Sequence, residues 1–449
     1  MPKFQSLKGF RDFYPEDFAT RSFITDTWRF VARKHGFQEY DAPPLESLEL
    51  YKHKSGEELV SQLYSFVDKG GREVAMRPEM TPSVARMIAE RWQSLAKPVR
   101  WFSVPQLFRY ERPQAGRLRE HFQFNADIFG DASPRAEAEL LAMVVDAFEA
   151  FSLTFEDVQV RLSDRRVLNG VLSRLGATPQ QLPTLYSVLD KFEREDRDRS
   201  RQRLRHAGIS DEQVRELFDL VETFRNVKSF AGLEAVLGEG DSFLAMLHDL
   251  SALIDDPWRW ITFDLTIVRG LGYYTGTVFE AFDTRGKYRA ICGGGRYDGL
   301  LESLGGPPAA AIGFGWGDVV LTELLRDLGK IPDPAPTVDW IVYMDQGPTH
   351  EAYPRVKRLR KMGFKVLGVP GPQGRKVQSQ AKASNSTEFF YVIGERTTVV
   401  RSRTGEIVRH HSYDVFLNEL EALIRTRQCI PTPDEIWTLA QSPHLRSTP

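Results

Sequence analysis

Two segments between residues 108 and 128 carry polar side chains that could act on a phosphate ester. In each segment apolar and polar residues alternate, which is typical of strands with one apolar and one polar face. The apolar positions are Phe108, Tyr110, Phe122, Phe124 and Ile128. The polar positions are Arg109, Glu111, Gln123, Asn125 and Asp127. The pattern predicts a hairpin whose polar face combines a guanidinium with carboxylates and amides.

The connection between the two segments is too long for a tight turn and is rich in cations. It contains Pro113, Gly116, Arg112, Arg117, Arg119 and Glu120. A basic loop of this kind suits a polyphosphate. A half-exposed hairpin with a solvated polar face would show the same alternation and is the alternative interpretation.

The composition is that of an ordinary globular protein. The 449 residues are 41% hydrophobic and 27% charged, enough for about three domains. The N-terminus lacks an apolar secretory run, and no stretch reaches the roughly 18 apolar residues of a membrane span, so we expect a cytoplasmic protein without membrane contact. Cys292 and Cys429 form neither a CxxC pair nor a metal-ligand spacing. A net charge of −2 excludes a globally basic nucleic-acid binder but allows locally basic surfaces.

The segments around the predicted hairpin indicate one α+β domain with an interruption. Helices are predicted over residues 21–34 and 134–151, and strands over 37–41, 158–162, 260–268, 273–282 and 289–292. Residues 165–235 show helical periodicity without strand signals. Their mixed-charge run, 190–205, favours a solvated helix face rich in ion pairs over a surface that contacts RNA.

A proline-rich linker at 331–337 separates a second domain of different organisation. Strands are predicted at 338–343, 365–369 and 389–393, followed by two short strands around Thr404-Gly405. Helices are predicted at 349–362, 376–383 and 413–425. This βαβαβ order indicates a mostly parallel sheet covered by helices. No element is predicted after Cys429.

Several motifs resemble the class II aminoacyl-tRNA synthetases and, within them, the histidyl-tRNA synthetase family. Residues 10–17, with the following helix and Ala42-Pro43, are similar to motif 1, the dimer-forming element, and residues 108–127 are similar to motif 2. Arg77-Pro-Glu-Met-Thr81 resembles the amino-acid-binding loop. Residues 269–276 and 294–299 resemble the two signatures of the histidine enzymes. The resemblance extends over nearly all of residues 5 to 425.

The resemblance implies an α+β fold, in which an antiparallel class II sheet with flanking helices receives a helical insertion and is followed by an α/β domain similar to an anticodon-binding module. The implied domains are a catalytic core in two parts, 1–164 and 236–330, the insertion 165–235, the anticodon-binding-like domain 338–425 and a tail 426–449. The implied activity is ligation of histidine to tRNA. L-histidine and ATP form histidyl-adenylate, and the histidyl group passes to the 3′ end of tRNA(His).

Arg109 and Arg269 are the catalytic residues that the resemblance implies. Arg109 would hold the α-phosphate and the histidine carboxylate, and Arg269 would lie opposite it, where other class II enzymes use a metal ion. Glu111 would lie near the adenine, and Arg117 is the candidate for the γ-phosphate. A planar guanidinium suits an anionic transition state better than a lysine does. A structural ion pair is the alternative for Arg269.

The resemblance also assigns residues to histidine itself. Besides Arg109 and Arg269, the implied set is Glu79, Met80, Thr81, Gln123, Asp127, Tyr273, Tyr274 and Tyr297. Glu79, Thr81 and Gln123 would surround the α-amino group, and Asp127 and the tyrosines would line the imidazole pocket. Core packing is an equal alternative for each tyrosine, and adjacent strand positions face oppositely, so we expect one of Tyr273 and Tyr274 to pack and the other to bind.

ATP, accompanied by Mg²⁺, enters as a substrate. No tightly bound metal or organic cofactor is expected, and the implied assembly is a homodimer. Gly293 to Gly295 lack the Lys-Ser/Thr of a phosphate-binding loop, so a close backbone approach beneath the substrate is the better interpretation.

The sequence departs from the family pattern at two positions. Gly272 stands where the family usually has an acidic residue, and Val320 stands where the class usually has an arginine that stacks on adenine. Trp316 or Phe314 could stack on adenine instead, although a buried core position is an equal alternative for each. Because some organelle-type histidine enzymes share the change at Val320, we interpret it as a subgroup trait.

Two other functions compete with the ligase. One is a catalytically silent paralogue that regulates ATP phosphoribosyltransferase in histidine biosynthesis. Such paralogues usually lack the C-terminal domain, whereas this chain has it and keeps Arg109, Gln123 and Arg269. The other is an RNA-binding paralogue without aminoacylation. The basic residues of 349–362, which could form an RNA surface or an exposed helix face, are Arg355, Lys357, Arg358, Arg360 and Lys361.

Overall fold

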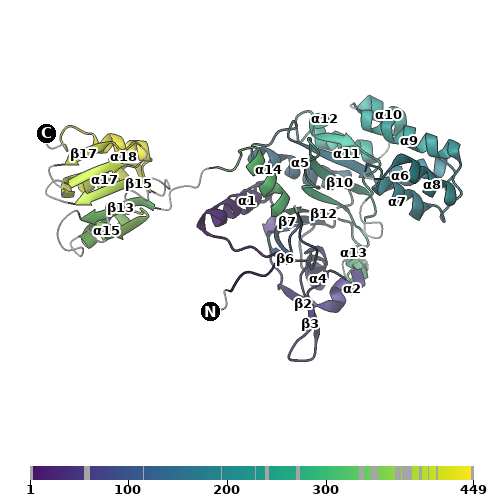
Figure 1. Ribbon diagram of the computed structural model, residues 1–449, viewed down its shortest axis with the longest axis horizontal. Helices are drawn as coiled ribbons and strands as arrows, with labels where there is room; N and C mark the ends of the chain where they lie inside the picture. Colours follow the sequence, from purple (N-terminus) through teal and green to yellow (C-terminus); the bar gives the residue numbers. More distant parts are fainter. Residues whose placement is uncertain are drawn as a thin grey trace. The chain divides into compact units, whose positions relative to one another are not determined.

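The computed structural model describes most of the chain. The described residues are 4–54, 61–114, 116–193, 195–227, 229–237, 242–268, 274–332, 338–344, 352–369, 376, 387–393, 397–402, 404–410 and 413–445. They belong to two compact units, Met1–Pro332 and Asp333–Pro449. Figure 1 draws both units, coloured along the sequence.

A nine-stranded sheet forms the centre of the described part of the first unit. Its order is β1-β5-β7-β12-β11-β10-β8-β9, and β6 pairs with β7. Neighbouring strands are antiparallel except β1 with β5 and β8 with β9, which are parallel. The strands are β1 (Gln38–Glu39), β5 (Val99–Ser103), β6 (Gln106–Phe108), β7 (Glu120–Phe129), β8 (Val158–Asp164), β9 (Ile261–Phe263), β10 (Thr277–Asp283), β11 (Cys292–Arg296) and β12 (Ala311–Gly317).

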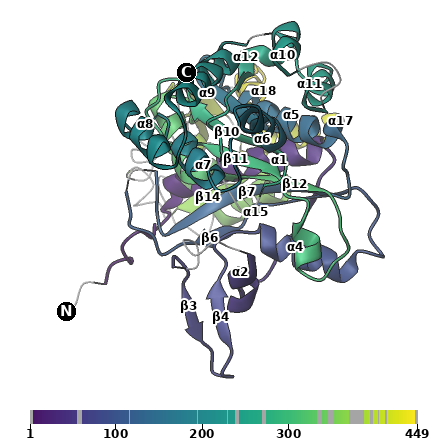
Figure 2. The same ribbon diagram turned by 90° about the vertical axis from the view of Figure 1, so that its right-hand side faces the viewer.

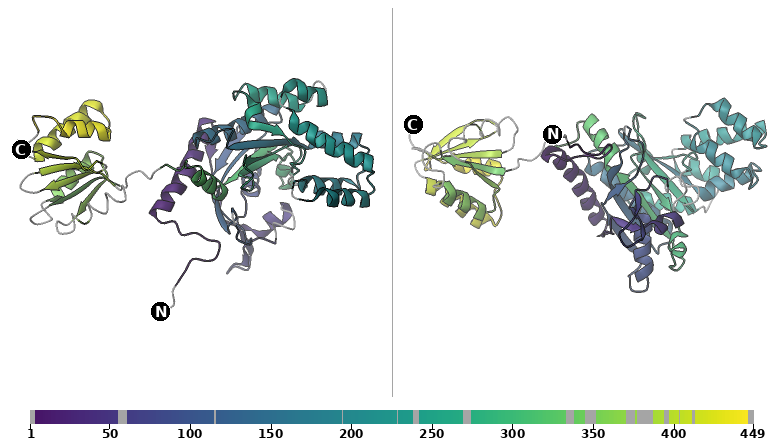
Figure 3. Two further views of the ribbon diagram at one scale, coloured as in Figure 1. Left: turned by 45° about the horizontal axis from the view of Figure 1, so that its top comes forward. Right: turned by 60° about the horizontal axis from the view of Figure 1, so that its bottom comes forward.

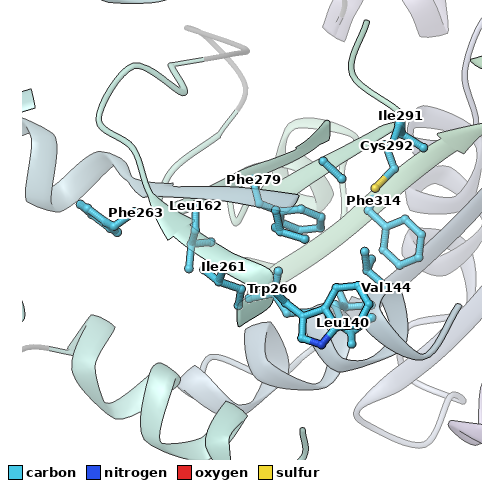
Figure 4. Close-up of a cluster of buried hydrophobic side chains, with 14 of the residues drawn as sticks. Leu140, Val144, Leu162, Trp260, Ile261, Phe263, Phe279, Ile291, Cys292 and Phe314 are labelled. Carbon is cyan, nitrogen blue, oxygen red and sulfur yellow. The ribbon is translucent and has the colours of Figure 1, made fainter. Parts of the chain in front are cut away.

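One face of this sheet is apolar because every second residue of its strands is hydrophobic. Two helices pack against this face, α1 (Pro15–Lys34) and α5 (Pro134–Ala150). Trp316 of β12 is fully buried there, and the centre of its ring lies 4.6 Å from that of Phe148 and 6.0 Å from that of Trp28. Figure 4 shows the same layer, in which Phe279 and Phe314 lie between the strands and the α5 residues.

The predicted strand pair is shorter than expected on its first side. β6 ends at Phe108, so Arg109 to Glu111 lie outside it. The backbone N–H groups of Arg109 and Tyr110 donate to the carbonyls of Arg119 and Gln62, 2.9 and 2.7 Å away. The half-exposed alternative is wrong for the second half of β7, because the polar residues Asn125 and Asp127 are buried as well as Phe124 and Ile128.

The region predicted to be a helical insertion is helical. It contains α6 (Arg165–Arg174), α7 (Leu182–Asp190), α8 (Arg197–His206), α9 (Asp211–Asn226) and α10 (Phe230–Leu237). In Figure 3 these teal helices form a group at one side of the sheet. Helical structure continues through α11 (Ser242–Ser251), which packs on α5, and α12 (Pro257–Trp260). The strand expected at 260–268 is therefore confined to the three residues of β9.

Ion pairs dominate α8, as the mixed-charge run predicts. Arg203 binds Glu195 at 2.7 Å, Arg197 binds Glu222 at 3.0 Å, and three further arginines have carboxylate partners. This observation favours the solvated helix over the RNA surface.

Smaller elements border the polar side of the sheet. A three-stranded sheet in the order β2-β4-β3 projects from the unit, as Figure 2 shows for β3 and β4. These strands are β2 (Leu45–Ser47), β3 (Ser65–Val67) and β4 (Glu73–Met76). The helices on this side are α2 (Leu48–Lys54), α4 (Thr81–Arg91) and α13 (Leu300–Ser303). A further helix, α14 (Asp318–Asp327), lies on the apolar side with α1, where Leu321, Leu324 and Leu325 join the same hydrophobic core.

The second unit has a five-stranded sheet in the order β14-β13-β15-β16-β17 within its described residues. Its first three strands are parallel, as predicted, and the last two pair in antiparallel fashion. The strands are β13 (Val338–Met344), β14 (Val366–Val369), β15 (Thr387–Ile393), β16 (Thr397–Arg401) and β17 (Ile407–His410). The helices are α15 (Tyr353–Lys361), α17 (Tyr413–Arg427) and α18 (Pro433–Ala440). The helix expected at 376–383 lies almost wholly outside the described residues.

The segment after Cys429 forms part of this second unit. Thr432 and Glu435 make a capping box that begins α18. Trp437 is buried, and its ring stacks on that of Phe389, with 6.4 Å between the ring centres. The tail is therefore not a separate segment: at least up to Leu445 it packs into the hydrophobic core.

Candidate active site

Glycines line the polar face of the central sheet. Directly paired residues of neighbouring antiparallel strands share a face. On this basis the register places five glycines on the face opposite to α1 and α5, namely Gly293, Gly295, Gly313, Gly315 and Gly317. β7 borders this floor on one side with Gln123, Asn125 and Asp127, and β10 borders it on the other side with Glu280.

The glycines leave room for the neighbouring functional side chains. A Cβ atom at Gly313 would lie 2.1 Å from Asp127 Oδ1, and one at Gly315 would lie 3.0 Å from the Gln123 Cδ. Any larger residue at Gly313 would therefore displace the Asp127 carboxylate. Without side chains of their own, these glycines form a floor between β7 and β10, over which the side chains of Asp127 and Gln123 lie.

The close approach expected at Gly293 to Gly295 is present, but the atoms that lie close to these glycines belong to neighbouring residues of the protein itself. A Cβ at Gly294 would lie 2.3 Å from the carbonyl oxygen of Gly313. A Cβ at Gly295 would lie 2.4 Å from the Thr277 carbonyl oxygen and 2.8 Å from Tyr274 Cδ1. At these two positions glycine is required by the adjacent strands and by a tyrosine ring.

Asp127 and Tyr297 form a buried polar pair at the edge of this floor. Both side chains are 2% exposed, and the Tyr297 hydroxyl donates a hydrogen bond to Asp127 Oδ1. The other oxygen, Oδ2, has no hydrogen-bond partner among the described residues. Burial raises the pKa of the Asp127 carboxyl to about 7, against the lowering effect of the Tyr297 hydrogen bond. The pair therefore offers a hydrogen-bond acceptor whose charge changes near neutral pH.

Arg109 is half-buried at the other end of the polar face. Its Nε donates to the carbonyl of Pro78 at 2.9 Å, which ties it to the loop between β4 and α4. Glu111 is buried and forms an ion pair with Arg117. The three residues predicted to bind ATP therefore lie in one region of the structure. The Arg117 guanidinium there forms an ion pair with the Glu111 carboxylate.

The loop predicted to bind the amino acid is held by a buried arginine. Arg77 donates to the carbonyls of Ala42 and Gln106 at 2.6 and 3.0 Å, and to the Asp41 carboxylate at 2.7 Å. This anchoring function was not expected from the sequence.

The three predicted residues that follow in this loop differ in environment. Glu79 is half-buried, and Thr81, also half-buried, is the first residue of α4. Met80 is fully buried with Ala42 and Leu107. Its side chain therefore has a packing role, and we do not propose it as a histidine contact.

Part of the first histidine-type signature lies outside the described residues, including Arg269, Gly272 and Tyr273. Tyr274 is described. It is half-buried and packs with the apolar cluster that contains Tyr297. Its carbonyl accepts a hydrogen bond from Arg165 Nη1 at 3.4 Å. These contacts give Tyr274 a packing role, and Tyr273 stays the predicted substrate contact of the two.

The two aromatic residues considered for adenine face the wrong side of the sheet. Trp316 and Phe314 alternate with Gly315 and Gly317, so they lie in the core beneath α1 and α5. The prediction that either could stack on adenine is therefore wrong. Val320 is buried near the basic loop, where a Cβ at Gly116 would lie 3.1 Å from its side chain.

Two polar-face residues were missed by sequence reasoning. Glu280 is buried in β10 next to Gly293, a position that only the strand pairing reveals. His121 precedes Gln123 by two residues in β7 and so shares its face, a signal that the alternation did contain. Burial, together with Arg109, Arg11 and Arg117, lowers the pKa of His121 to about 3, so its ring is neutral.

No group of three or more potential metal ligands occurs among the described residues. In the same residues no helix is long and apolar enough to cross a membrane.

Comparisons with known proteins identify relatives of this chain. Residues 9–317 match the family model described as histidyl-tRNA synthetase. The chain is 46% identical over 376 residues to the histidine–tRNA ligase of Opitutus terrae, a match that covers 82% of this chain and 85% of that protein. It is 42% identical over 337 residues to the chloroplastic/mitochondrial histidine–tRNA ligase of Arabidopsis thaliana, covering 75% and 68%.

Solved structures share the fold. The histidyl-tRNA synthetase from Nostoc has a TM-score of 0.76 at 24% identity, covering 95% of this chain and 100% of that one. An ATP phosphoribosyltransferase regulatory subunit/histidyl-tRNA synthetase from Bacillus halodurans has a TM-score of 0.71 at 23% identity, covering 88% and 99%. The family model and the curated relatives together show that this chain belongs to the histidyl-tRNA synthetase family.

Proposed function

We propose that the protein is a histidine–tRNA ligase, which activates L-histidine with ATP and transfers the histidyl group to the 3′ end of tRNA(His). The observation that carries this proposal is the Asp127–Tyr297 pair above the glycine floor. Asp127 Oδ2 can accept the N–H of an imidazole ring lying on the glycines. Such a site rejects side chains without that donor, because its own buried acceptor would then be left without a partner.

Adenylate formation joins two anions. A histidine carboxylate oxygen attacks the α-phosphorus of ATP, the bond to the bridging oxygen of the β-phosphate breaks, and pyrophosphate leaves with the electron pair. Arg109 lies within the motif that would hold the α-phosphate, and Arg269 is proposed as the second guanidinium. Both would stabilise the charge that develops on the phosphorus oxygens. Mg²⁺ enters with ATP, and a tightly bound metal or organic cofactor has no place in this proposal.

Gln123, Glu79 and Thr81 are proposed to hold the α-amino group, which leaves the carboxylate to the arginines. His121 is proposed as the ring that faces adenine, because it is neutral and lies on the polar face beside Gly317. A Cβ at Gly317 would lie 3.8 Å from His121 Cδ2, which is an ordinary van der Waals contact. Arg117 can serve the γ-phosphate if ATP draws it from Glu111.

We further propose a homodimer that buries the N-terminal segment and α1. This region carries exposed large hydrophobic side chains, namely Phe4, Leu7, Tyr14, Phe18 and Phe30, and Phe30 is 65% exposed although it lies within a helix. An apolar surface of this kind is typical of an interface. Light scattering should give twice the chain mass, and Phe30→Glu should weaken the dimer. A monomeric wild-type protein would contradict this assembly.

The second unit is proposed to bind tRNA(His). Its fold and its presence also argue against the regulatory paralogue, which would neither activate histidine nor charge tRNA. Histidine-dependent exchange of labelled pyrophosphate into ATP tests the proposal, with each of the other amino acids as controls. We expect exchange with histidine alone, followed by charging of tRNA(His). A folded protein that supports no exchange would contradict the ligase and favour the regulator.

A further inference from the structure

Arg11 joins three segments of the first unit that are far apart in the sequence. It lies in the extended segment before α1, and its side chain is 23% exposed. Its Nε lies 2.6 Å from Glu120 Oε1, and its Nη1 lies 2.9 Å from Asp318 Oδ2. Glu120 is the first residue of β7, and Asp318 is the first residue of α14. One guanidinium thus connects the N-terminal segment, the strand that borders the glycine floor and the helix that follows β12.

The two carboxylates have little contact with water. Their exposures are 1% for Glu120 and 2% for Asp318. Glu120 Oε2 accepts a hydrogen bond from the Gln106 amide at 2.9 Å, and Asp318 Oδ1 accepts one from the Phe122 backbone N–H at 2.9 Å. The planar fork of Arg11 gives each carboxyl group a cationic partner, which offsets the cost of placing two acidic groups out of contact with water.

The same segment supports the residues proposed for ATP. The Gly9 carbonyl accepts the backbone N–H of Arg119 at 2.9 Å, and the Arg119 carbonyl accepts that of Arg109, also at 2.9 Å. Arg119 directly precedes Glu120. On the α14 side, Glu323 Oε1 accepts the backbone N–H of Gly116 at 3.4 Å. The basic loop between β6 and β7 is therefore held between the N-terminal segment and α14, and Arg11 sets the separation of its two supports.

We propose that Arg11 is a positioning residue for ATP. It keeps the start of β7 and the start of α14 at a fixed distance, so that Arg109, His121 and the basic loop are arranged before ATP arrives. This inference rests on the proposed ATP site. The contacts proposed for the imidazole ring have separate anchors, because Asp127 binds Tyr297, and the preceding Arg296 binds Glu137 of α5 at 2.6 Å. Loss of the bridge should therefore affect ATP more than histidine.

Arg11→Lys tests the proposal, because lysine keeps the charge but cannot bridge two carboxylates with a planar fork. We expect the KM for ATP in pyrophosphate exchange to rise about tenfold, as small misplacements of binding groups do, while the KM for histidine changes less than about twofold. Arg197→Lys is the matched control, since Arg197 pairs with Glu222 at 3.0 Å on the exposed surface of the helical insertion. Its kinetics should equal those of the wild type.

An unchanged KM for ATP in Arg11→Lys, or equal increases for ATP and histidine, would overturn the proposal, whatever the thermal stability of the variant. If Arg11→Lys does not fold, Glu120→Gln takes its place, because it breaks one arm of the bridge without leaving a buried charge unpaired. The same selective rise in the KM for ATP is expected for this variant, and an unchanged KM for ATP would also overturn the proposal. Calorimetric binding of ATP alone should weaken about tenfold in parallel. A wild-type protein that binds ATP but supports no exchange would contradict the proposed ligase activity. The calorimetric comparison of ATP binding would still test the positioning role of Arg11.

Discussion

Replacing Asp127 with asparagine should separate the stability of the site from its function. The carboxylate is 2% exposed and its pKa is about 7, whereas an aspartate in an unfolded chain has a pKa of about 3.9. Because the folded-state pKa is raised, ionisation of Asp127 opposes folding. The cost is absent below the unfolded pKa, grows as the pH rises towards about 7 and is constant above it, where it reaches about 4 kcal/mol.

Asparagine removes this cost but introduces a new one. It keeps the acceptor for Tyr297 and places an amide N–H where Oδ2 has no described partner, which costs about 1–3 kcal/mol. Asp127→Asn should therefore be no more stable than the wild type near pH 5 and more stable near pH 8. The gap in unfolding free energy should grow by about 2–3 kcal/mol between these two pH values. For a unit of this size that corresponds to about 4 °C in Tm.

Thermal unfolding of both proteins at several pH values measures the gap, and Asp219→Asn, at an exposed position of α9, is the control that should show none. Exchange kinetics on the same samples should show the opposite trend. Wild-type kcat/KM for histidine should exceed that of the variant by a ratio that rises as Asp127 ionises. The substrate titrates equally with both proteins, so the ratio reports Asp127. Parallel stability curves, or a ratio independent of pH, would refute the reasoning.

Three further changes test the rest of the site. Gly313→Ala should lower kcat/KM for histidine by at least about a hundredfold, because the new Cβ would lie 2.1 Å from Asp127 Oδ1, whereas Gly317→Ala should have little effect on histidine; equal effects in exchange assays would refute the glycine floor. Arg109→Lys should lower kcat for adenylate formation by about a hundredfold with the fold intact by circular dichroism, since a point charge replaces a planar fork, and near-normal exchange would remove Arg109 from the mechanism. Ending the chain after residue 335 should leave exchange within a few-fold of normal and greatly reduce tRNA charging; an equal loss of both would indicate a structural role for the second unit.

Local patterns were sufficient to predict β7 and its polar face. The alternation along Phe122 to Ile128 placed Gln123, Asn125 and Asp127 together, and the structure confirms that they share a face. The same alternation places His121 on this face, although no motif had indicated that residue. The helix α18 was not predicted, although its signal is local, because Thr432 and Glu435 have the spacing of a capping box.

Other features depend on contacts that a local pattern does not contain. The sides on which Gly293 and Glu280 lie follow from pairing with strands tens of residues away. The register of β6 and β7 pairs Arg109 with Arg119, and the N–H of Arg109 still donates to that carbonyl. The first side of the predicted hairpin ends there because the N–H of Tyr110 donates to Gln62 instead. Trp316 could have been assigned to the core from its alternation with Gly315 and Gly317 once β12 was known to pair with β7, but that pairing is itself a long-range fact.

A crystal structure with a non-hydrolysable histidyl-adenylate analogue tests the central claim most directly. The imidazole should lie on the face formed by Gly313 and Gly315, with one ring N–H within about 3 Å of Asp127 Oδ2, and the phosphate should lie beside Arg109. An analogue bound with its imidazole away from Asp127, or on another face of the sheet, would contradict the account.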